Sequence, residues 1–299
     1  MLKTRQLGRS ALHVTELGFG TMSLPNDSKM ATELLETAFG SGIRFFDTAD
    51  LYGGGTNEQL LAPFLKAHRH DVVLATKVGN ELQPDGSWTW NPTKSYIMDA
   101  VKTSLQKLGT DYIDLYQLHG GTMEDHVDET IEAFEALKKE GVIRAYGISS
   151  IRPNVIDRFL TRSSAASVMM QYSPLDRRPE EWLPMIQEHG ASVITRGTVA
   201  KGLLTAHGAI PSKVAKGFVG YTAAALHDTL AQLETVTDLH AASIQYVLQE
   251  EAVATALVGA SSVDQLLESV KAYERGATDA DVQALRNATQ AHQYEAHRV

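Results

Sequence analysis

"FFDTADLYGGGTNE" (45–58) decides between two folds for this chain. Its three consecutive glycines suit a phosphate-binding loop, but they also suit a turn that delivers Asp47 and Tyr52 to a site at the end of a strand. A dinucleotide fingerprint needs GxGxxG directly after the first strand, and "GFGTMS" (18–23) has a serine in the third glycine position. The triple glycine follows the second strand, so we interpret it as a turn.

Eight short apolar runs alternate with longer amphipathic segments, and they span 16–21, 43–49, 71–78, 112–119, 143–150, 167–173, 192–198 and 254–260. Near-continuous apolar strands are typical of parallel sheets that are buried on both faces. Eight successive βα units predict an α/β chain folded as a (β/α)8 TIM barrel, in a single domain that spans 1–299. A doubly wound sheet is the alternative, and it lacks its fingerprint.

Helical periodicity fills the intervening segments. Segments 93–109 and 128–141 both end at glycine, a helix-stop signal. Segment 56–68 opens with Thr56 and Gln59 at the spacing of a capping box.

Three features exceed the minimal barrel. Residues 1–15 predict a short N-terminal hairpin that closes the bottom of the barrel, and 203–226 form a long connection after the seventh strand. An extra C-terminal helix is predicted over 279–296. We expect this tail to pack as a helix and to leave an open, promiscuous site.

Composition narrows the class of protein. The chain has 27 basic and 36 acidic residues among 299, a formal net charge of −9, so nucleic acid is not an expected partner. It has no cysteine, which excludes disulfides, thiolate metal sites and cysteine nucleophiles, and which fits a cytoplasmic location. No apolar stretch of about 18 residues is present, so we expect no membrane partner.

Polar side chains stand at three consecutive strand ends. Asp47 and Tyr52 follow the second strand, Lys77 ends the third and His119 ends the fourth. Each residue alone has an ordinary interpretation, as a loop cap, packing, a solvated strand end or a chance histidine. Active sites of such barrels lie where strands end, so the joint pattern predicts an active site.

The chain resembles the aldo-keto reductases, through segments that occur in the family's order along nearly the whole chain. The matching segments are "LGFGTM", "FFDTADLYGGGTNE", "LATKVG", "SLQKLGTDYIDLYQLH", "LKKEGVIRAYGISS", "QYSPLDRR", "RGTVAKGLLT" and "VGASSVDQLLESV". The resemblance implies NAD(P)H-dependent reduction of aldehydes or ketones to alcohols. It also implies a catalytic tetrad of Asp47, Tyr52, Lys77 and His119.

The expected chemistry gives each tetrad residue a role. Hydride transfer to a carbonyl carbon builds negative charge on the oxygen, so a positioned acid must supply a proton. We assign Tyr52 as this donor and Lys77 as the group that tunes it, because a nearby ammonium favours a phenolate. Asp47 keeps Lys77 charged and oriented, and His119 donates to the carbonyl oxygen and orients the substrate.

The resemblance places the cofactor against the remaining strand ends, at Gly20, Thr21, Met22, Asp47, Ser149, Ser150, Gln171, Arg196, Gly197, Thr198, Val199, Ala200, Leu203, Gly259, Ser261, Gln265 and Glu268. In the family, the positions of Ser149, Ser150 and Gln171 hold the nicotinamide carboxamide, although position 150 more often carries Asn. The segment from Gly197 to Leu203 matches the part that lies over the pyrophosphate.

Two positions depart from the family pattern. Arg196 stands where many relatives have an aromatic residue that stacks on nicotinamide, and a planar guanidinium can also stack. We expect it beside the ring or the adjoining phosphates, with a surface ion pair as the alternative. Positions 260–270 lack an arginine for a 2′-phosphate. NADP(H) is favoured on family grounds, and NAD(H) remains a competitor.

The substrate is expected to be a small-molecule carbonyl compound. Met22, Tyr52 and His119 face its site, and Trp88 or Trp90 either walls the pocket or pins its loop to the barrel. A slowly turning redox-sensing regulatory protein of the same fold is the alternative function. A metal-dependent barrel has no support, because His119 has no companions at ligand spacing such as HxH or HExxH. The oligomeric state stays open.

Overall fold

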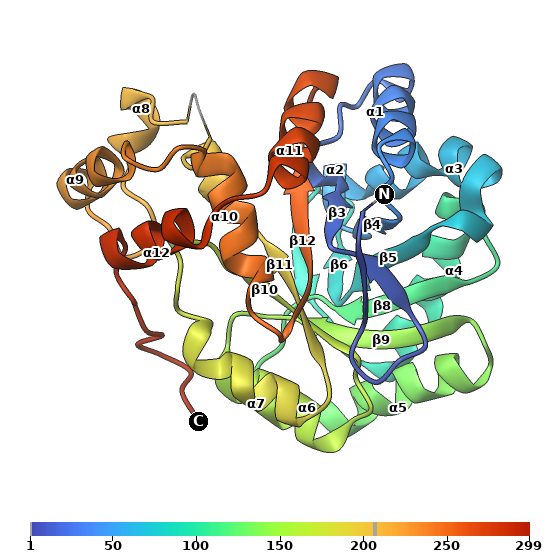
Figure 1. Ribbon diagram of the computed structural model, residues 1–299. Helices are drawn as coiled ribbons and strands as arrows, with labels where there is room; N and C mark the ends of the chain where they lie inside the picture. Colours follow the sequence, from blue (N-terminus) through green and yellow to red (C-terminus); the bar gives the residue numbers. More distant parts are fainter. Residues whose placement is uncertain (1, 206–207) are drawn as a thin grey trace.

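Eight parallel strands close into a barrel in the computed structural model, which describes residues 2–205 and 208–299 (Figure 1). They are β3 (Leu17–Gly20), β4 (Phe45–Asp47), β5 (Val73–Val78), β8 (Ile113–Leu118), β9 (Ile143–Ser149), β10 (Ser167–Gln171), β11 (Ser192–Arg196) and β12 (Val253–Gly259). Each strand pairs with its neighbours along the chain, and β12 pairs with β3 to complete the ring. The predicted (β/α)8 barrel is confirmed.

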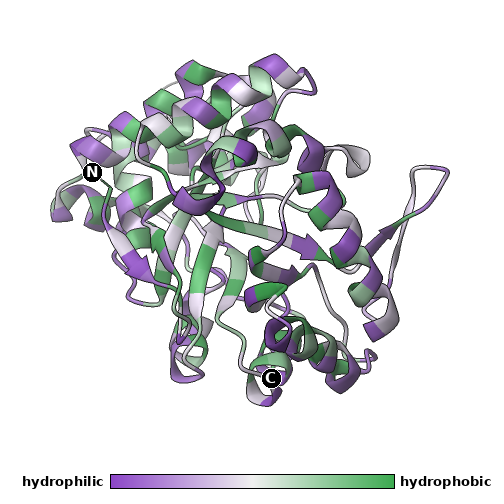
Figure 2. Cartoon of the chain, turned by 90° about the vertical axis from the view of Figure 1, so that its right-hand side faces the viewer, coloured by the Kyte–Doolittle hydropathy of each residue, from purple (hydrophilic) through white to green (hydrophobic). Residues whose placement is uncertain are grey.

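Helices surround the barrel. They are α1 (Ser28–Gly40), α2 (Tyr52–Gly55), α3 (Asn57–His68), α4 (Lys94–Leu108), α5 (Val127–Lys139), α6 (Pro153–Arg162), α7 (Leu183–Glu188), α8 (Pro211–Val214), α9 (Ala223–Leu233), α10 (Leu239–Leu248), α11 (Val263–Arg275) and α12 (Asp279–Ala288). Hydrophobic residues alternate with hydrophilic ones along them, as helices that cover a core require (Figure 2). None of the helices in the described part of the chain is long and apolar enough to cross a membrane.

Local sequence signals fix the helix ends. The Thr93 side chain caps α4 by accepting from the Tyr96 amide, and Gly109 ends it with φ 64°. The capping box predicted at Thr56 is wrong. The turn α2 runs directly into α3, so Thr56 has helical dihedrals and its hydroxyl donates to the Gly53 carbonyl. A capping box does form at the start of α12, between Thr278 and Asp281.

The interior of the barrel has an apolar floor below a polar mouth. A buried cluster joins Phe45, Ala75, Leu115, Met169 and Ile194 of five strands with other inward side chains. Side chains alternate along a strand, so the residues two positions further point to the same side. Those residues are Asp47, Lys77, Gln117, Gln171 and Arg196, and the barrel therefore turns them toward its mouth.

The predicted N-terminal hairpin is confirmed and packs against the interior cluster. β1 (Thr4–Gln6) pairs antiparallel with β2 (His13–Thr15), and Leu7 and Val14 are buried in that cluster. Gly8 lies so close to the barrel that a Cβ there would stand 2.3 Å from the Ala166 carbonyl oxygen. Its φ of 53° also favours glycine.

The predicted extra C-terminal helix is confirmed as α12, but it is shorter than expected. α12 ends at Ala288, and residues 289–299 run on without a helix to the first turn of α6 and the 3-10 turn that precedes α7. The Arg298 guanidinium binds both carboxylate oxygens of Glu181, and the His297 carbonyl accepts from the Asn154 amide. These tertiary contacts replace the helical hydrogen bonds that the sequence pattern predicted.

Candidate active site

A buried ion pair forms the base of the site. The Lys77 Nζ atom lies 2.6 Å from Asp47 Oδ2 and 2.7 Å from the Thr48 carbonyl oxygen, and Lys77 is completely buried. Burial alone lowers the pKa of Lys77, but the adjacent Asp47 and Tyr52 raise it overall above its ordinary value. Burial raises the pKa of Asp47, and the Lys77 charge opposes that rise. Lys77 is therefore held as a cation at the mouth of the barrel.

The turn α2 carries Tyr52 over this cation. The Lys77 Nζ atom lies 3.3 Å from Tyr52 Oη, and the phenol is half-buried. Gly53 and Gly54 have left-handed dihedrals, with φ of 59° and 62°. A side chain at either position would be strained, so the triple glycine is needed for the backbone of this turn and holds no phosphate fingerprint.

His119 completes the cluster from the end of β8. Its ring centroid lies 5.8 Å from that of Tyr52, in an edge-to-face arrangement. Burial, together with the charges of Lys77 and Arg196, lowers the pKa of His119 to about 3. The imidazole is therefore neutral at physiological pH and carries one N–H. Its Nδ1 atom has no hydrogen-bond partner among the described residues.

The structure thus brings Asp47, Tyr52, Lys77 and His119 together, and it adds a residue that sequence reasoning missed. Gln117 is buried and donates from Nε2 to Asp47 Oδ1 at 3.3 Å. It pairs in register with Lys77 across β5 and β8. Strand parity could have found it, because Gln117 lies two residues before His119.

Asn57 is a second missed residue. Its side chain accepts from the Thr21 and Thr48 hydroxyls, both at 2.8 Å, and donates to the Thr21 carbonyl. This fully buried network ties the end of β3 to the loop after β4. The Thr21 hydroxyl also lies within hydrogen-bond distance of the Asp47 carbonyl, so it holds this loop and is not free for a ligand.

A buried carboxyl pair lies behind the Tyr52 turn. Burial, followed by the nearby charge of Glu58, raises the pKa of Asp50 to about 8. Burial also raises the pKa of Glu58, whose Oε1 accepts from the Thr76 hydroxyl at 2.7 Å. One oxygen of each carboxyl group is buried without a partner in the described part of the chain. Asp50 lies two residues before Tyr52, in the loop that leads into this turn.

The expected carboxamide site lies on the next strand ends around the barrel. Arg196 donates from Nη1 to Gln171 Oε1 at 3.0 Å, so the guanidinium stands beside the predicted carboxamide position and makes no ion pair with a carboxylate in the described residues. Ser149 pairs in register with Met169 of β10 and is nearly buried. Ser150 is also nearly buried, and its hydroxyl accepts from the Arg152 amide.

The segment predicted to lie over the pyrophosphate has unusual backbone dihedrals. Ala200 and Lys201 have φ of 48° and 56°, a left-handed conformation that side chains rarely adopt. Thr198 is buried and donates to the Leu257 carbonyl, and Leu203 is buried too. Gly197 and Val199 remain accessible, with Gly197 at φ 69°. Backbone groups, more than side chains, are thus available to a ligand here.

The expected adenosine end lies at the start of α11. Ser262 caps the helix, and Gln265 Oε1 accepts from the backbone amide and the hydroxyl of Ser261. Glu268 and Gly259 are exposed. An anion at this helix end would therefore have to displace the Gln265 side chain.

The substrate side is formed by a hairpin and an exposed methionine. β6 (Asn80–Leu82) pairs with β7 (Trp88–Trp90), and Trp90 donates from Nε1 to Asp125 at 2.8 Å. A Cβ on Gly79 would meet the Trp90 ring at 2.6 Å, so this indole pins the hairpin to the barrel. Trp88 is 54% exposed and Met22 is 67% exposed. Both are free to contact a bound molecule.

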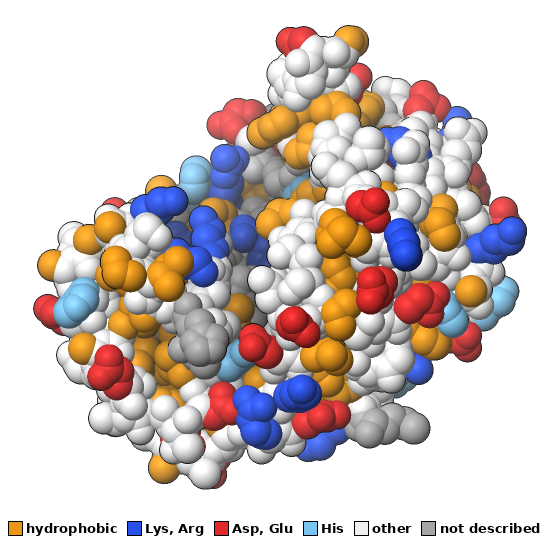
Figure 3. All heavy atoms as spheres, turned by 90° about the horizontal axis from the view of Figure 1, so that it is seen from above, with side chains coloured by type: hydrophobic (Ala, Val, Ile, Leu, Met, Phe, Trp, Pro, Cys, Tyr) orange, Lys and Arg blue, Asp and Glu red, His pale blue; other side chains and the backbone are white. Residues whose placement is uncertain are grey.

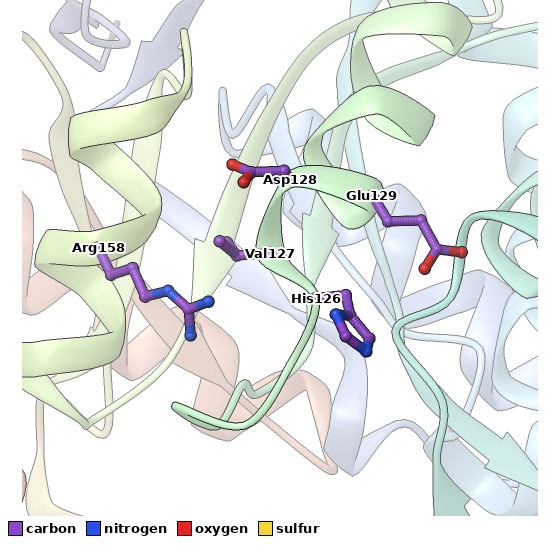
Figure 4. Close-up of a pocket in the computed structure, with 5 residues that line it drawn as sticks. All are labelled: His126, Val127, Asp128, Glu129 and Arg158. Atoms are coloured by element: carbon purple, nitrogen blue, oxygen red, sulfur yellow. The ribbon is translucent and has the colours of Figure 1, made fainter.

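Hollows elsewhere on the surface are separate from the tetrad. One, of about 410 Å³, lies at the start of α5 beside Arg158 (Figure 4). The Arg158 guanidinium donates to the Met123 and Asp125 carbonyls. Another, of about 560 Å³, is lined by Leu203, Thr205, Ala209 and Val214 together with side chains of α9 and α10. Seen from above, Lys and Arg side chains gather beside a hollow of the molecule (Figure 3).

Comparisons with known proteins agree with this geometry. A family model described as the aldo/keto reductase family matches residues 16–290. The chain is 48% identical to the uncharacterized oxidoreductase YqkF of Bacillus subtilis (strain 168), over 99% of this chain and 100% of that protein. It is similar to the holo form of aldo-keto reductase AKR11C1 from Bacillus halodurans, with a TM-score of 0.96, 52% identity and full coverage of both chains. The apo form of that protein gives a TM-score of 0.88 at 50% identity, again with full coverage of both chains.

Proposed function

We propose a reaction for this chain on one established premise: it belongs to the aldo/keto reductase family. The proposal is NAD(P)H-dependent reduction of an aldehyde or ketone to an alcohol, with Tyr52 as the proton donor. The observation that carries it is the position of Lys77, whose Nζ atom lies 2.6 Å from Asp47 Oδ2 and 3.3 Å from Tyr52 Oη. A cation beside a phenol favours the phenolate that remains after the proton has left, so this arrangement suits proton donation by tyrosine.

Each tetrad residue has a defined part in the proposed step. Tyr52 gives the proton of Oη to the carbonyl oxygen as negative charge develops there. Lys77 stabilises the phenolate that remains, and Asp47 keeps Lys77 charged. Neutral His119 donates a hydrogen bond to the same oxygen and orients the substrate. When bound, the nicotinamide cofactor supplies the hydride.

The residues present fit a nicotinamide cofactor. Gln171 offers an amide carbonyl at the mouth of the barrel, and Ser149 lies on the neighbouring strand end. A Cβ on Gly20 would meet no atom closer than 3.8 Å, so there is room for a ligand beside this glycine. Gly197 and Val199 offer accessible backbone groups for the pyrophosphate, whereas the expected contact at Ala200 is buried and its amide donates to the Gly197 carbonyl. Ser261, Gln265 and Glu268 would hold the adenosine end.

NADPH is the cofactor that we propose as preferred, with NADH as the competitor. Family resemblance favours NADPH. Asp264 is the acidic residue in the first turn of α11, and no arginine is present in 260–270. Without a charge-assisted hydrogen bond to a 2′-phosphate, we expect the preference to be less than about tenfold. The ratio of kcat/KM for the two cofactors measures it.

The proposed reaction is tested by following the absorbance of NADPH with a panel of aldehydes, with and without a chelator. Chelator-insensitive oxidation that depends on the aldehyde supports it. Tight NADPH binding without turnover would instead indicate the regulatory alternative, and a chelator-sensitive reaction without NADPH would indicate a metal-dependent barrel.

A further inference from the structure

The side-chain amide of Gln171 is held at both ends. Its Nε2 atom donates to Asp176 Oδ2 at 2.8 Å, and its Oε1 atom accepts from Arg196 Nη1 at 3.0 Å. Asp176 returns over Gln171 because the segment between them turns sharply, with reciprocal backbone hydrogen bonds between Ser173 and Asp176.

The chemistry of the two partners fixes the orientation of this amide. A carboxylate only accepts hydrogen bonds, and a guanidinium only donates them. If the Gln171 amide rotated by half a turn, its oxygen would face the Asp176 carboxylate and its NH2 group would face Arg196. Both contacts would be repulsive, so Oε1 stays on the side of Arg196. The second lone pair of Oε1 then remains available to an incoming N–H group.

Asp176 is itself held by the C-terminal tail. It is completely buried, and Arg178 binds both of its oxygens, at 2.7 Å and 2.8 Å. The ring of Tyr294 covers this guanidinium, 4.8 Å from Arg178 Cζ. The cation–π contact and the two hydrogen bonds to Asp176 hold the Arg178 guanidinium in place. The tail therefore reaches the mouth of the barrel through one continuous chain of contacts.

We propose that Asp176 is a positioning residue that makes Gln171 present its carbonyl oxygen to the NH2 group of the cofactor carboxamide, and that Tyr294 of the C-terminal tail holds Asp176 through Arg178. This inference rests on the proposed function, because it takes Gln171 as the carboxamide contact. Asp176 and Tyr294 touch neither substrate nor the reacting atoms, so their effect is on recognition of the cofactor.

The test compares NADPH with its reduced 3-acetylpyridine analogue, which carries a methyl group in place of the amide NH2. We expect the wild-type chain to bind NADPH about tenfold more tightly than the analogue, since one hydrogen bond is at stake. In Asp176→Asn, one neutral side-chain oxygen replaces the two charged oxygens that Arg178 and Gln171 bind, and the asparagine NH2 group faces a donor of one of them. The Gln171 amide is then held less firmly at its NH2 end, and the preference for NADPH should fall to about twofold or less.

Asp114→Asn is the matched control, because Asp114 is also a nearly buried aspartate that is paired with an arginine, Arg69. It should keep the full preference for NADPH even if the protein is less stable. A purely structural role of Asp176 would weaken the binding of both cofactors equally. An Asp176→Asn variant that keeps the wild-type ratio of dissociation constants overturns the proposal.

Tyr294→Leu is the second variant, and it keeps the proposal testable if Asp176→Asn does not fold. It should reduce the preference in the same direction and by a smaller factor, and an unchanged ratio counts against the role of the tail. A wild-type chain that binds both cofactors equally overturns the Gln171 contact on which the proposal rests. A wild-type chain that binds neither cofactor overturns the proposed function itself.

Discussion

Two parts of the barrel mouth hold polar side chains at equivalent inward positions but support them differently. At the ends of β4 and β5, Asp47 and Lys77 are buried and bonded directly to each other. At the ends of β10 and β11, Gln171 and Arg196 are half-buried, and the segment that follows has left-handed Ala200. The first part is complete without a ligand, whereas the second offers hydrogen-bonding groups to one. Catalytic and cofactor-binding substitutions should therefore have different signatures.

Lys77→Met should have the largest effect, because it removes the cation from the first part. It leaves the buried Asp47 carboxylate without its cation and with Gln117 as the remaining side-chain donor, so we expect the free energy of unfolding to fall by about 3–5 kcal/mol. Turnover should fall by about 10²–10⁴-fold, since nothing then stabilises the Tyr52 phenolate. Chemical denaturation and steady-state kinetics measure the two effects.

Lys102→Met is the control for this substitution. Lys102 is an exposed lysine that pairs with Asp99 on the surface of α4, so its loss should change stability by less than about 1 kcal/mol. If Lys77→Met were as stable and as active as Lys102→Met, neither the stability nor the turnover of the chain would depend on the Asp47–Lys77 ion pair.

Arg196→Ala tests the second part and should have an intermediate effect. It removes a charged hydrogen bond to Gln171 Oε1, so we expect the KM for the cofactor to rise by about tenfold. Stability should change little, since Arg196 is half-buried and forms no ion pair with a carboxylate within the described residues. An Arg162→Ala variant, which loses an exposed pair with Asp128, is the control. Unchanged cofactor affinity and turnover in Arg196→Ala would contradict this assignment.

Asp50→Asn should have the smallest effect. It should change how the free energy of unfolding depends on pH. Folded Asp50 keeps its proton up to about pH 8, whereas an unfolded aspartate releases it near 3.8. The folded chain binds more protons between these values, so its free energy of unfolding falls as pH rises through this window. The asparagine side chain cannot ionise, so the free energy of unfolding of the variant does not fall in this way as pH rises.

At about pH 8 we expect the Asp50→Asn variant to melt at least about 3 °C above the wild type, which is roughly 1 kcal/mol for a domain of this size. Near pH 4 the difference should vanish. Thermal unfolding at both pH values checks it, with the exposed Asp99→Asn as control. A melting difference that is independent of pH would show that Asp50 does not titrate in this window.

The sequence predicted the barrel and the tetrad because both depend on local patterns. Each tetrad residue stands at or just after the end of an apolar run, and the barrel topology alone brings those ends together. Gln117 could be predicted in the same way, because side chains alternate along a strand and Gln117 lies two residues before His119. The contacts of Asp176 could not be predicted in this way, because Tyr294 lies more than a hundred residues further along the chain and reaches Arg178 only through tertiary packing.

The errors in the sequence predictions have the same cause. Thr56 and Gln59 have the spacing of a capping box, but the preceding turn α2 puts Thr56 in a helical conformation that cannot cap α3. The apolar pattern of the C-terminal tail is helical only to Ala288, after which contacts with Glu181 and Asn154 determine its path. Tertiary contacts overrode local preference at both positions.

The most direct test of the account is the rate at which Tyr52→Phe oxidises bound NADPH when an aldehyde is added, measured beside the dissociation constant for NADPH. Removal of one oxygen atom keeps the ring that packs against His119. We predict a rate at least about 10²-fold below that of the wild type, with NADPH affinity changed by less than about twofold. A variant that turns over at the wild-type rate would contradict the assignment of Tyr52 as the proton donor.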